Sequence, residues 1–221
     1  LQDSVISILL TDSRRLSFPE QTLFFALSTK TNDGHRYIGD LYKLRVRNFV
    51  VSRMLPEFES MTDANFLLVK DVLKALQKLA IYHRKRFQIP VIGITGSNGK
   101  TVVKEFLYQL LHNEFNIVRS PRSYNSQIGV PLSVWEMNEK NTLGIFEAGI
   151  SQPDEMENLQ PIIAPTIGVL TCMGEAHQEN FISMNQKCQE KLTLFSESEA
   201  IIYDGDDVFI SNAIEAACLS H

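Results

Sequence analysis

The sequence is poor in the residues that mark disulfide-rich or membrane-spanning proteins. It has three cysteines and one tryptophan in 221 residues. Cys172, Cys188 and Cys218 lack metal-ligand spacing, and an odd number of cysteines in apolar surroundings predicts reduced thiols in a cytoplasmic protein. No apolar run approaches the roughly 18 residues of a membrane span, so we expect no membrane segment.

Positive charge is also scarce. The 21 lysines and arginines are outnumbered by 26 acidic residues, which gives a net charge of -5. A nucleic-acid-binding protein usually shows a basic face, so we expect no nucleic-acid partner. Two basic clusters, at 83–86 and 43–47, lie in or beside amphipathic segments and are expected to be solvated helix faces. Hydrophobic residues make up 44% of the chain, enough for the cores of one large or two small domains.

The most informative segment is a glycine-rich stretch that follows the β-branched run at 91–95. Its glycines let backbone N–H groups surround phosphate oxygens, Lys100 adds positive charge, and the Thr101 hydroxyl can hold Mg²⁺. Helical apolar spacing follows, and a helix N-terminus favours anions. Ile94 stands where the common phosphate-loop pattern has glycine, and a glycine-rich turn with an incidental lysine is the alternative. The predicted phosphate-binding residues are Thr95, Gly96, Ser97, Asn98, Gly99, Lys100 and Thr101.

Strands and helices alternate on both sides of a proline-punctuated segment at 88–90, where we place a domain boundary. Domain 1–88 is predicted to be a small mixed α/β domain with strands at 5–10, 22–27, 48–51 and 66–69, and a helix at 71–86. Domain 89–221 is predicted to have strands at 91–95, 116–119, 142–147, 166–173 and 200–203, each followed by a helix. This alternation is typical of a parallel sheet with helices on both faces, here an incomplete phosphate-loop ATPase domain.

Ligands of an open parallel sheet bind at the carboxyl ends of its strands, and polar residues follow every strand predicted in the second domain. Glu147 alone could be a helix cap, but its place near the phosphate loop predicts a Mg²⁺ ligand. His177 is equally consistent with a metal ligand and with a polar loop residue. Lys187 and Lys191 share one helical face, a pattern typical of an exposed lysine pair.

The loop with Ile94 resembles the variant phosphate loop of the Mur ligases, ATP-dependent amide-forming enzymes of peptidoglycan precursor synthesis. The resemblance covers nearly the whole chain, through segments 12–15, 23–27, 33–35, 124–131, 146–149 and 175–177, and Lys191. Segments 12–14 and 128–131 are most similar to the members that add D-alanyl-D-alanine to UDP-N-acetylmuramoyl-tripeptide. Segment 119–126 resembles members fused to an alanine racemase, which would add pyridoxal phosphate as a cofactor.

The resemblance implies a role for each matching residue. The implied catalytic residues are Lys100, Glu147, His177 and Lys191. Thr101 and Glu147 would hold one Mg²⁺ beside ATP and His177 a second, and Lys191 matches a lysine that CO₂ converts to a carbamate ligand. Asn125 would position substrate or the γ-phosphate. The residues implied for the UDP end are Ser13, Arg14, Asp33, Gly34 and His35, although 28–32 lacks the glycine usual before that turn.

The implied reaction forms an acyl phosphate and ADP, and the amine of D-alanyl-D-alanine then displaces phosphate. Another Mur ligase that forms the tripeptide, or a folylpolyglutamate synthase-like ligase, shares the ATPase core. The 88 residues before the loop favour a Mur ligase over a folate enzyme, which would start near its phosphate loop. A non-catalytic nucleotide-binding module is the alternative of another class. The first residues resemble an internal boundary and the last a helix that continues, so we expect the 221 residues alone to form no product.

Overall fold

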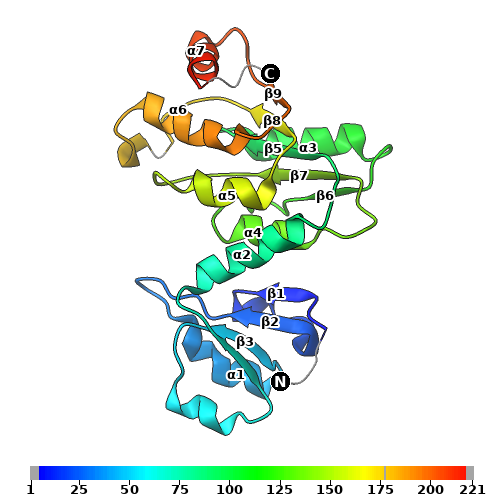
Figure 1. Ribbon diagram of the computed structural model, residues 1–221, viewed down its shortest axis with the longest axis vertical. Helices are drawn as coiled ribbons and strands as arrows, with labels where there is room; N and C mark the ends of the chain where they lie inside the picture. The colour runs from blue at the N-terminus through cyan, green and yellow to red at the C-terminus, as the bar shows by residue number, and fades with distance from the viewer. Residues whose placement is uncertain (1–4, 177, 218–221) are drawn as a thin grey trace. The chain divides into compact units, whose positions relative to one another are not determined.

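The computed structural model describes residues 5–176 and 178–217. These residues form two compact units, which divide between Leu76 and Gln77. The division falls within a helix, whereas the sequence places a domain boundary at the segment 88–90. The domain limits 1–88 and 89–221 therefore stay a prediction. Each unit is built around its own sheet (Figure 1).

The first unit has a four-stranded sheet in which every neighbouring pair is parallel. Its strands, in spatial and sequence order, are β1 (Ile8–Leu10), β2 (Thr22–Phe25), β3 (Asn48–Val51) and β4 (Asn65–Leu68). Its core includes the stacked rings of Phe49, Phe66 and Phe58. The sequence predicted these strands, and the structure adds that their order in the sheet follows the chain.

Helices and 3₁₀ turns connect these strands. They are η1 (Ser13–Arg15), η2 (Pro19–Gln21), η3 (Gly34–Tyr37), α1 (Ile38–Lys43) and η4 (Pro56–Ser60). Helix α2 (Val72–Arg84) follows β4. The Asp71 carboxylate accepts a hydrogen bond from the backbone N–H of Lys74 at 2.9 Å and so caps this helix.

The second unit has a five-stranded parallel sheet in the order β6-β7-β5-β8-β9. Its strands are β5 (Val91–Thr95), β6 (Ile117–Arg119), β7 (Leu143–Glu147), β8 (Ile167–Leu170) and β9 (Ala200–Ile202). Its helices are α3 (Lys100–Leu111), α4 (Gly129–Trp135), α5 (Met156–Ile163), η5 (Gln178–Asn180), α6 (Met184–Leu192), η6 (Thr193–Phe195) and α7 (Val208–Ala216). The predicted parallel α/β sheet is confirmed.

The strand order makes β5 the centre of this sheet (Figure 1). The chain leaves β5 for the edge strand β6, returns through β7 on one side of β5, and then crosses to β8 on the other side. Where the connections diverge in this way, a crevice opens at the carboxyl ends of the strands. The predicted phosphate loop, 95–101, begins at that crevice.

The two faces of the second sheet are covered unequally. Helices α4, α5, α6 and α7 contribute to the large core on one face. On the other face, Val103, Leu107 and Leu111 of α3 pack against residues of the central strands. The remaining apolar residues of α3, which are Val102, Phe106 and Leu110, are exposed. The apolar side chains of α3 are therefore divided between partly buried and exposed positions.

The basic cluster at 83–86 corrects one expectation. Lys85 and Arg86 are exposed, but His83 and Arg84 are buried. Arg84 donates hydrogen bonds to the carbonyl oxygens of Ile163 at 2.8 Å, Phe87 at 2.7 Å and Ala164 at 3.0 Å. Two of these carbonyls belong to the end of α5, whose last carbonyls have no partner within the helix. The prediction of a solvated face is wrong for these two residues, because the arginine caps another helix.

Two further expectations concern membranes and thiols. Within the part of the chain that the structure describes, no helix is long and apolar enough to cross a membrane. Cys172 and Cys188 are free, and Cys188 is buried. Cys218 lies outside the described residues.

We expect Arg84→Met to lower the free energy of unfolding by about 2–4 kcal/mol, because one buried and two partly buried carbonyls lose a charged donor. Lys85→Met is the matched control, since it removes the same charge from an exposed neighbour. Urea unfolding of both variants measures the difference. Equal stability of the two variants would show that Arg84 is not a structural cap.

Candidate active site

The phosphate loop turns sharply over the end of β5. Gly96 has a φ of 142° and Gly99 a φ of 80°, both in the region that favours glycine. A Cβ atom at Gly96 would lie 2.0 Å from Thr171 Oγ1, which leaves no room for a side chain. Gly99 is the N-cap of α3, so the loop ends at a helix N-terminus, where anions are stabilised.

Hydrogen bonds hold this loop against the segment after β8. The backbone N–H of Ser97 donates to the carbonyl of Cys172 at 2.8 Å. The Ser97 hydroxyl donates to the Gly174 carbonyl at 3.1 Å and accepts from the Gly174 N–H at 2.9 Å. Thr171 Oγ1 donates to the Asn98 carbonyl, while the Asn98 residue itself is exposed. No pattern in the sequence indicated this contribution of Thr171 and Gly174.

The predicted loop residues differ in what their side chains do. The Thr95 hydroxyl is buried and donates to the Ala148 carbonyl at 2.9 Å, so it fixes the end of β5 to the segment after β7. Lys100 Nζ lies over the loop and donates to the Gly96 carbonyl at 2.7 Å. Burial lowers the pKa of Lys100, and the nearby Glu147 carboxylate opposes that shift. The amino group of Lys100 is thus positioned over the loop backbone that would surround a phosphate.

Glu147 is the last residue of β7 and is fully buried. Its Oε2 accepts a hydrogen bond from Thr101 Oγ1 at 3.0 Å. Its Oε1 lies 2.9 Å from Lys104 Nζ as an ion pair but accepts no hydrogen bond. A buried carboxylate beside a threonine hydroxyl suits Mg²⁺, which takes oxygen ligands and keeps several from water and phosphate.

Lys187 and Lys191 both lie at this edge of the sheet, and the expectation of an exposed lysine pair is wrong. Their side chains are 1% and 2% exposed, because α6 turns this face toward the phosphate loop. Lys191 Nζ donates to the Gly96 carbonyl at 3.3 Å, and Lys187 Nζ donates to the Gly174 carbonyl. Burial lowers the pKa of Lys191 to about 7, and repulsion from Lys100 and Lys187 adds to the effect.

The segment after β6 reaches the same edge. The Asn125 carbonyl accepts from the Gly149 N–H at 2.8 Å, and a Cβ atom at Gly149 would lie 3.0 Å from the Asn125 side-chain amide. Asn125 is thus close to the residues that follow Glu147. His177 lies outside the described residues. Among residues 5–176 and 178–217, no group of three or more His, Cys, Asp or Glu side chains could hold a metal ion, so a metal here would need hydroxyl, water or phosphate oxygens.

Ser13 and Arg14 lie in η1, directly after β1 in the first unit. Asp12 caps this turn and accepts from Arg14 Nε at 2.9 Å and from Arg14 Nη2 at 2.8 Å. The hydrogen bond from Arg14 holds the pKa of Asp12 below its usual value. The Arg14 side chain is 86% exposed, so its planar group is oriented but still accessible.

The turn after β2 contains Asp33, Gly34 and His35, whose contacts lie within the first unit. A Cβ atom at Gly34 would lie 2.8 Å from backbone atoms of Ala26 and Leu27. His35 is buried, and its Nε2 accepts from the Ser52 N–H at 3.1 Å. The Nδ1 therefore carries the proton and donates to Asp33 Oδ1 at 2.7 Å. These contacts join the segments after β2 and β3, at the same sheet edge as η1.

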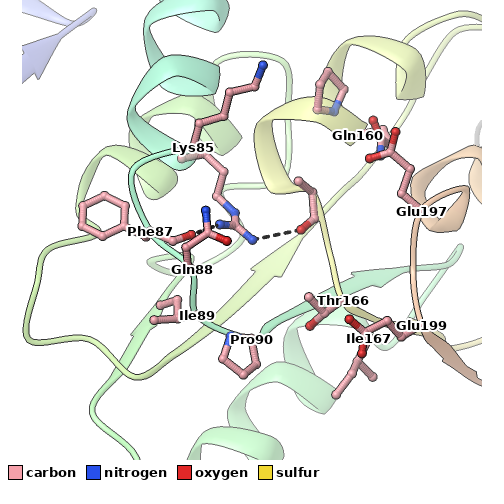
Figure 2. A pocket seen from close by; sticks show the side chains of 13 residues that line it. Lys85, Phe87, Gln88, Ile89, Pro90, Gln160, Thr166, Ile167, Glu197 and Glu199 are labelled. Carbon is pink, nitrogen blue, oxygen red and sulfur yellow. Dashed lines mark hydrogen bonds between the residues drawn. The ribbon is translucent and has the colours of Figure 1, made fainter.

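A cavity of about 720 Å³ lies at the opposite edge of the second sheet (Figure 2). Pro90 and Thr166, which precede β5 and β8, line it together with Gln160 of α5 and Glu197. The phosphate loop is at the carboxyl ends of the same strands. None of the residues predicted from the sequence to bind ligands lines this cavity.

The sequence prediction missed Lys104, a buried lysine on α3. Its Nζ contacts Glu147 and donates to the carbonyl of Ser120 at 2.8 Å. One signal was present, because Lys104 shares helical spacing with Leu107 and Leu111, which pack on the sheet. A charged residue on an otherwise apolar helix face indicates a buried ionic partner.

Comparisons with known proteins relate this chain to one family. The family model of the Mur ligase middle domain matches residues 94–220. The UDP-N-acetylmuramoyl-tripeptide–D-alanyl-D-alanine ligase of Bacillus subtilis is 30% identical over 96% of this chain and 46% of the relative. The chain spans about half the length of the curated relatives it matches.

Solved structures show the same relationship. MurF from Acinetobacter baumannii superimposes with a TM-score of 0.85 at 26% identity, over 96% of this chain and 46% of the other. MurF ligase from Thermotoga maritima in complex with ADP gives 0.82 at 26% identity, over 94% and 48%. A UDP-N-acetylmuramoyl-L-alanyl-D-glutamate–2,6-diaminopimelate ligase gives 0.58 at 14% identity over 96% and 46%, which shows the fold alone.

We expect Gly96→Ala to destabilise the protein by about 2–4 kcal/mol, because the new methyl group meets Thr171 and the backbone conformation is strained. Gly205→Ala is the matched control, since a Cβ atom there has no neighbour within 4 Å. Thermal unfolding and ADP binding are measured for both variants. Wild-type stability and ADP affinity in Gly96→Ala would contradict the described loop geometry.

Proposed function

This chain belongs to the Mur ligase family, and we propose that it is part of the ATP-dependent ligase that joins D-alanyl-D-alanine to UDP-N-acetylmuramoyl-tripeptide in peptidoglycan precursor synthesis. One observation carries the proposal. The phosphate loop, the pair of Thr101 and Glu147, and the buried Lys191 meet at one sheet edge. Relatives with this printed name match up to 98% of this chain, including the unit before the loop.

Lys100 and the backbone N–H groups of the loop would bind the ATP phosphates. The ADP complex of the Thermotoga maritima relative supports an adenine nucleotide as ligand. Thr101 and Glu147 would hold Mg²⁺, because Thr101 Oγ1 and Glu147 Oε2 are adjacent. When bound, Mg²⁺ reduces the repulsion between a triphosphate and a second anion.

The proposed reaction has two steps. A carboxylate oxygen of the tripeptide attacks the γ-phosphorus of ATP, the bond to the bridging oxygen breaks, and ADP leaves. The amine of D-alanyl-D-alanine then attacks the acyl phosphate, loses a proton, and phosphate departs. Both partners of the first step are anions, so Lys100 contributes by stabilising the transferred phosphoryl group. Asn125, beside the segment after Glu147, is placed to position the carboxylate or the γ-phosphate.

Lys191 would react with CO₂ and become an anionic carbamate. Only the neutral amine reacts in this way: its nitrogen bonds to the carbon of CO₂ and releases one proton. The burial that lowers the pKa of Lys191 to about 7 makes the neutral amine abundant at neutral pH, which supports this part of the proposal. The second Mg²⁺ site at His177 stays a prediction from the sequence.

The first unit would hold the UDP end of the precursor through Ser13, Arg14, Asp33, Gly34 and His35. Arg14 is suited to a diphosphate, because its planar group is exposed and already oriented by Asp12. Asp33 and His35 are engaged with each other and with Arg53 and Ser52. We infer that these two shape the turn and that its backbone faces the ligand.

The alternatives have less support. The solved 2,6-diaminopimelate ligase, a Mur ligase that forms the tripeptide, is only 14% identical to this chain. The folylpolyglutamate synthase-like alternative is represented by L. casei FPGS, which is 12% identical to it. A non-catalytic nucleotide-binding module would need the phosphate loop but not a buried lysine of lowered pKa beside it. The cytoplasmic location indicated by the free cysteines belongs to the same proposal. Fusion to an alanine racemase with pyridoxal phosphate stays a prediction.

We expect Lys100→Ala to reduce amide formation by at least about 100-fold, because the variant loses charge that stabilises the phosphoryl group. The assay measures ADP release and ligated product with the full-length gene product that contains these residues. Lys140→Ala removes an exposed lysine as the control. A wild-type rate of ADP release in a folded Lys100→Ala variant would refute the phosphate-loop assignment.

We expect Arg14→Ala to weaken binding of UDP-N-acetylmuramoyl-tripeptide about tenfold or more through the loss of charged hydrogen bonds, with ATP affinity unchanged. Lys43→Ala is the control, because it also removes a positive charge from an exposed side chain of the first unit. Calorimetric titration of both ligands separates the effects. Unchanged precursor affinity in Arg14→Ala would place the UDP end elsewhere.

A further inference from the structure

A lysine outside the predicted site lies against the carboxylate that we assign to Mg²⁺. Lys104 is on α3, about one turn after Lys100, and its side chain is fully buried. Its Nζ lies 2.9 Å from Glu147 Oε1 and 3.2 Å from Glu105 Oε1. A buried ammonium group needs such partners, because an isolated charge is costly away from water.

Lys104 connects three segments of the chain at the carboxyl edge of the sheet. It belongs to the helix that follows the phosphate loop, and it contacts Glu147 at the end of β7. Its Nζ also donates to the carbonyls of Ser120, at 2.8 Å, and Arg122, both in the segment after β6. Ser120 reaches Glu147 as well, since its hydroxyl accepts from the Glu147 N–H at 3.2 Å.

The segment after β6 adopts a conformation that needs support. Arg122 has a φ of 51°, in the left-handed region that costs energy for a residue other than glycine. The hydrogen bond from Lys104 to the Arg122 carbonyl holds this conformation. The same segment leads to Asn125, beside Gly149. The position of Asn125 is therefore linked to Lys104 through the backbone.

The contacts of Lys104 distinguish it from a phosphate ligand. Its hydrogen bonds go to backbone carbonyls, and its charge faces Glu147. The two oxygens of Glu147 therefore have different partners: Oε1 faces Lys104, and Oε2 faces Thr101. This arrangement fixes the orientation of the carboxylate within the protein itself.

We propose that Lys104 is a positioning residue that orients Glu147 toward Thr101 and anchors the segment 120–125. The inference rests on the proposed function, because it takes Thr101 and Glu147 as ligands of Mg²⁺. Residues that hold a metal ligand in place typically change metal affinity about 10- to 100-fold when they are replaced. We expect Lys104→Met to raise the Mg²⁺ concentration needed for half-maximal ADP binding by about that factor.

The experiment titrates Mg²⁺ at a fixed ADP concentration and follows ADP binding by calorimetry, with the full-length gene product. ADP affinity without Mg²⁺ is measured in parallel and is expected to be unchanged. Lys104→Arg keeps the charge and should recover part of the Mg²⁺ affinity. Lys140→Met is the control for an exposed lysine and should match the wild type.

The outcomes separate this inference from the proposed function. Lower thermal stability of Lys104→Met with an unchanged Mg²⁺ requirement would overturn it, because Lys104 would then be structural only. If Lys104→Met does not fold, Lys104→Gln is decisive, because it keeps a hydrogen-bond donor but loses the charge that faces Glu147: a raised Mg²⁺ requirement supports positioning, and an unchanged one overturns it. A wild-type protein whose ADP binding ignores Mg²⁺ would refute the proposed metal site and this inference together.

Discussion

The second unit depends on the close approach of two backbone segments at Gly96. The chain turns back over the end of β5 at this residue, and the segment after β8 leaves no space for a side chain there. The hydrogen bonds of Ser97 and Thr171 exist because of this approach. Glycine is therefore needed for packing as well as for its φ, and the same contact gives the phosphate loop one fixed shape.

The edge of the sheet around this loop concentrates positive charge. Lys104, Lys187 and Lys191 are buried there, and Glu147 is the one acidic side chain among the buried residues that the structure describes. Burying unequal charge costs stability, and proteins retain such arrangements mainly at functional sites. A triphosphate would supply the missing negative charge. The depressed pKa of Lys191 shows the same imbalance, since the neighbouring lysines disfavour its charged form.

The two units use their predicted residues differently. In the second unit, Lys100 and Glu147 lie close together because the strands that precede Lys100 and end at Glu147, β5 and β7, are parallel neighbours. In the first unit, Asp33 and His35 satisfy each other, while Arg14 remains exposed. The histidine and the aspartate of this short motif are thus partners of each other, because a buried imidazole needs a partner for each nitrogen. The exposed arginine keeps its donors accessible.

Periodicity and glycine placement are local features, so they were enough to predict the alternation of strands and helices, the parallel sheet of the second unit, and the phosphate loop with its following helix. The position of Glu147 at a strand end near the phosphate loop predicted it as a Mg²⁺ ligand, whereas only the family resemblance implied a role for Lys191. The three-dimensional arrangement was needed to establish the strand order around β5, the burial of Lys191 and Arg84, and the pairing of Lys104 with Glu147. These features join residues that are distant in the chain, so their physical cause, the burial of a charge against a particular partner, cannot be read from local spacing.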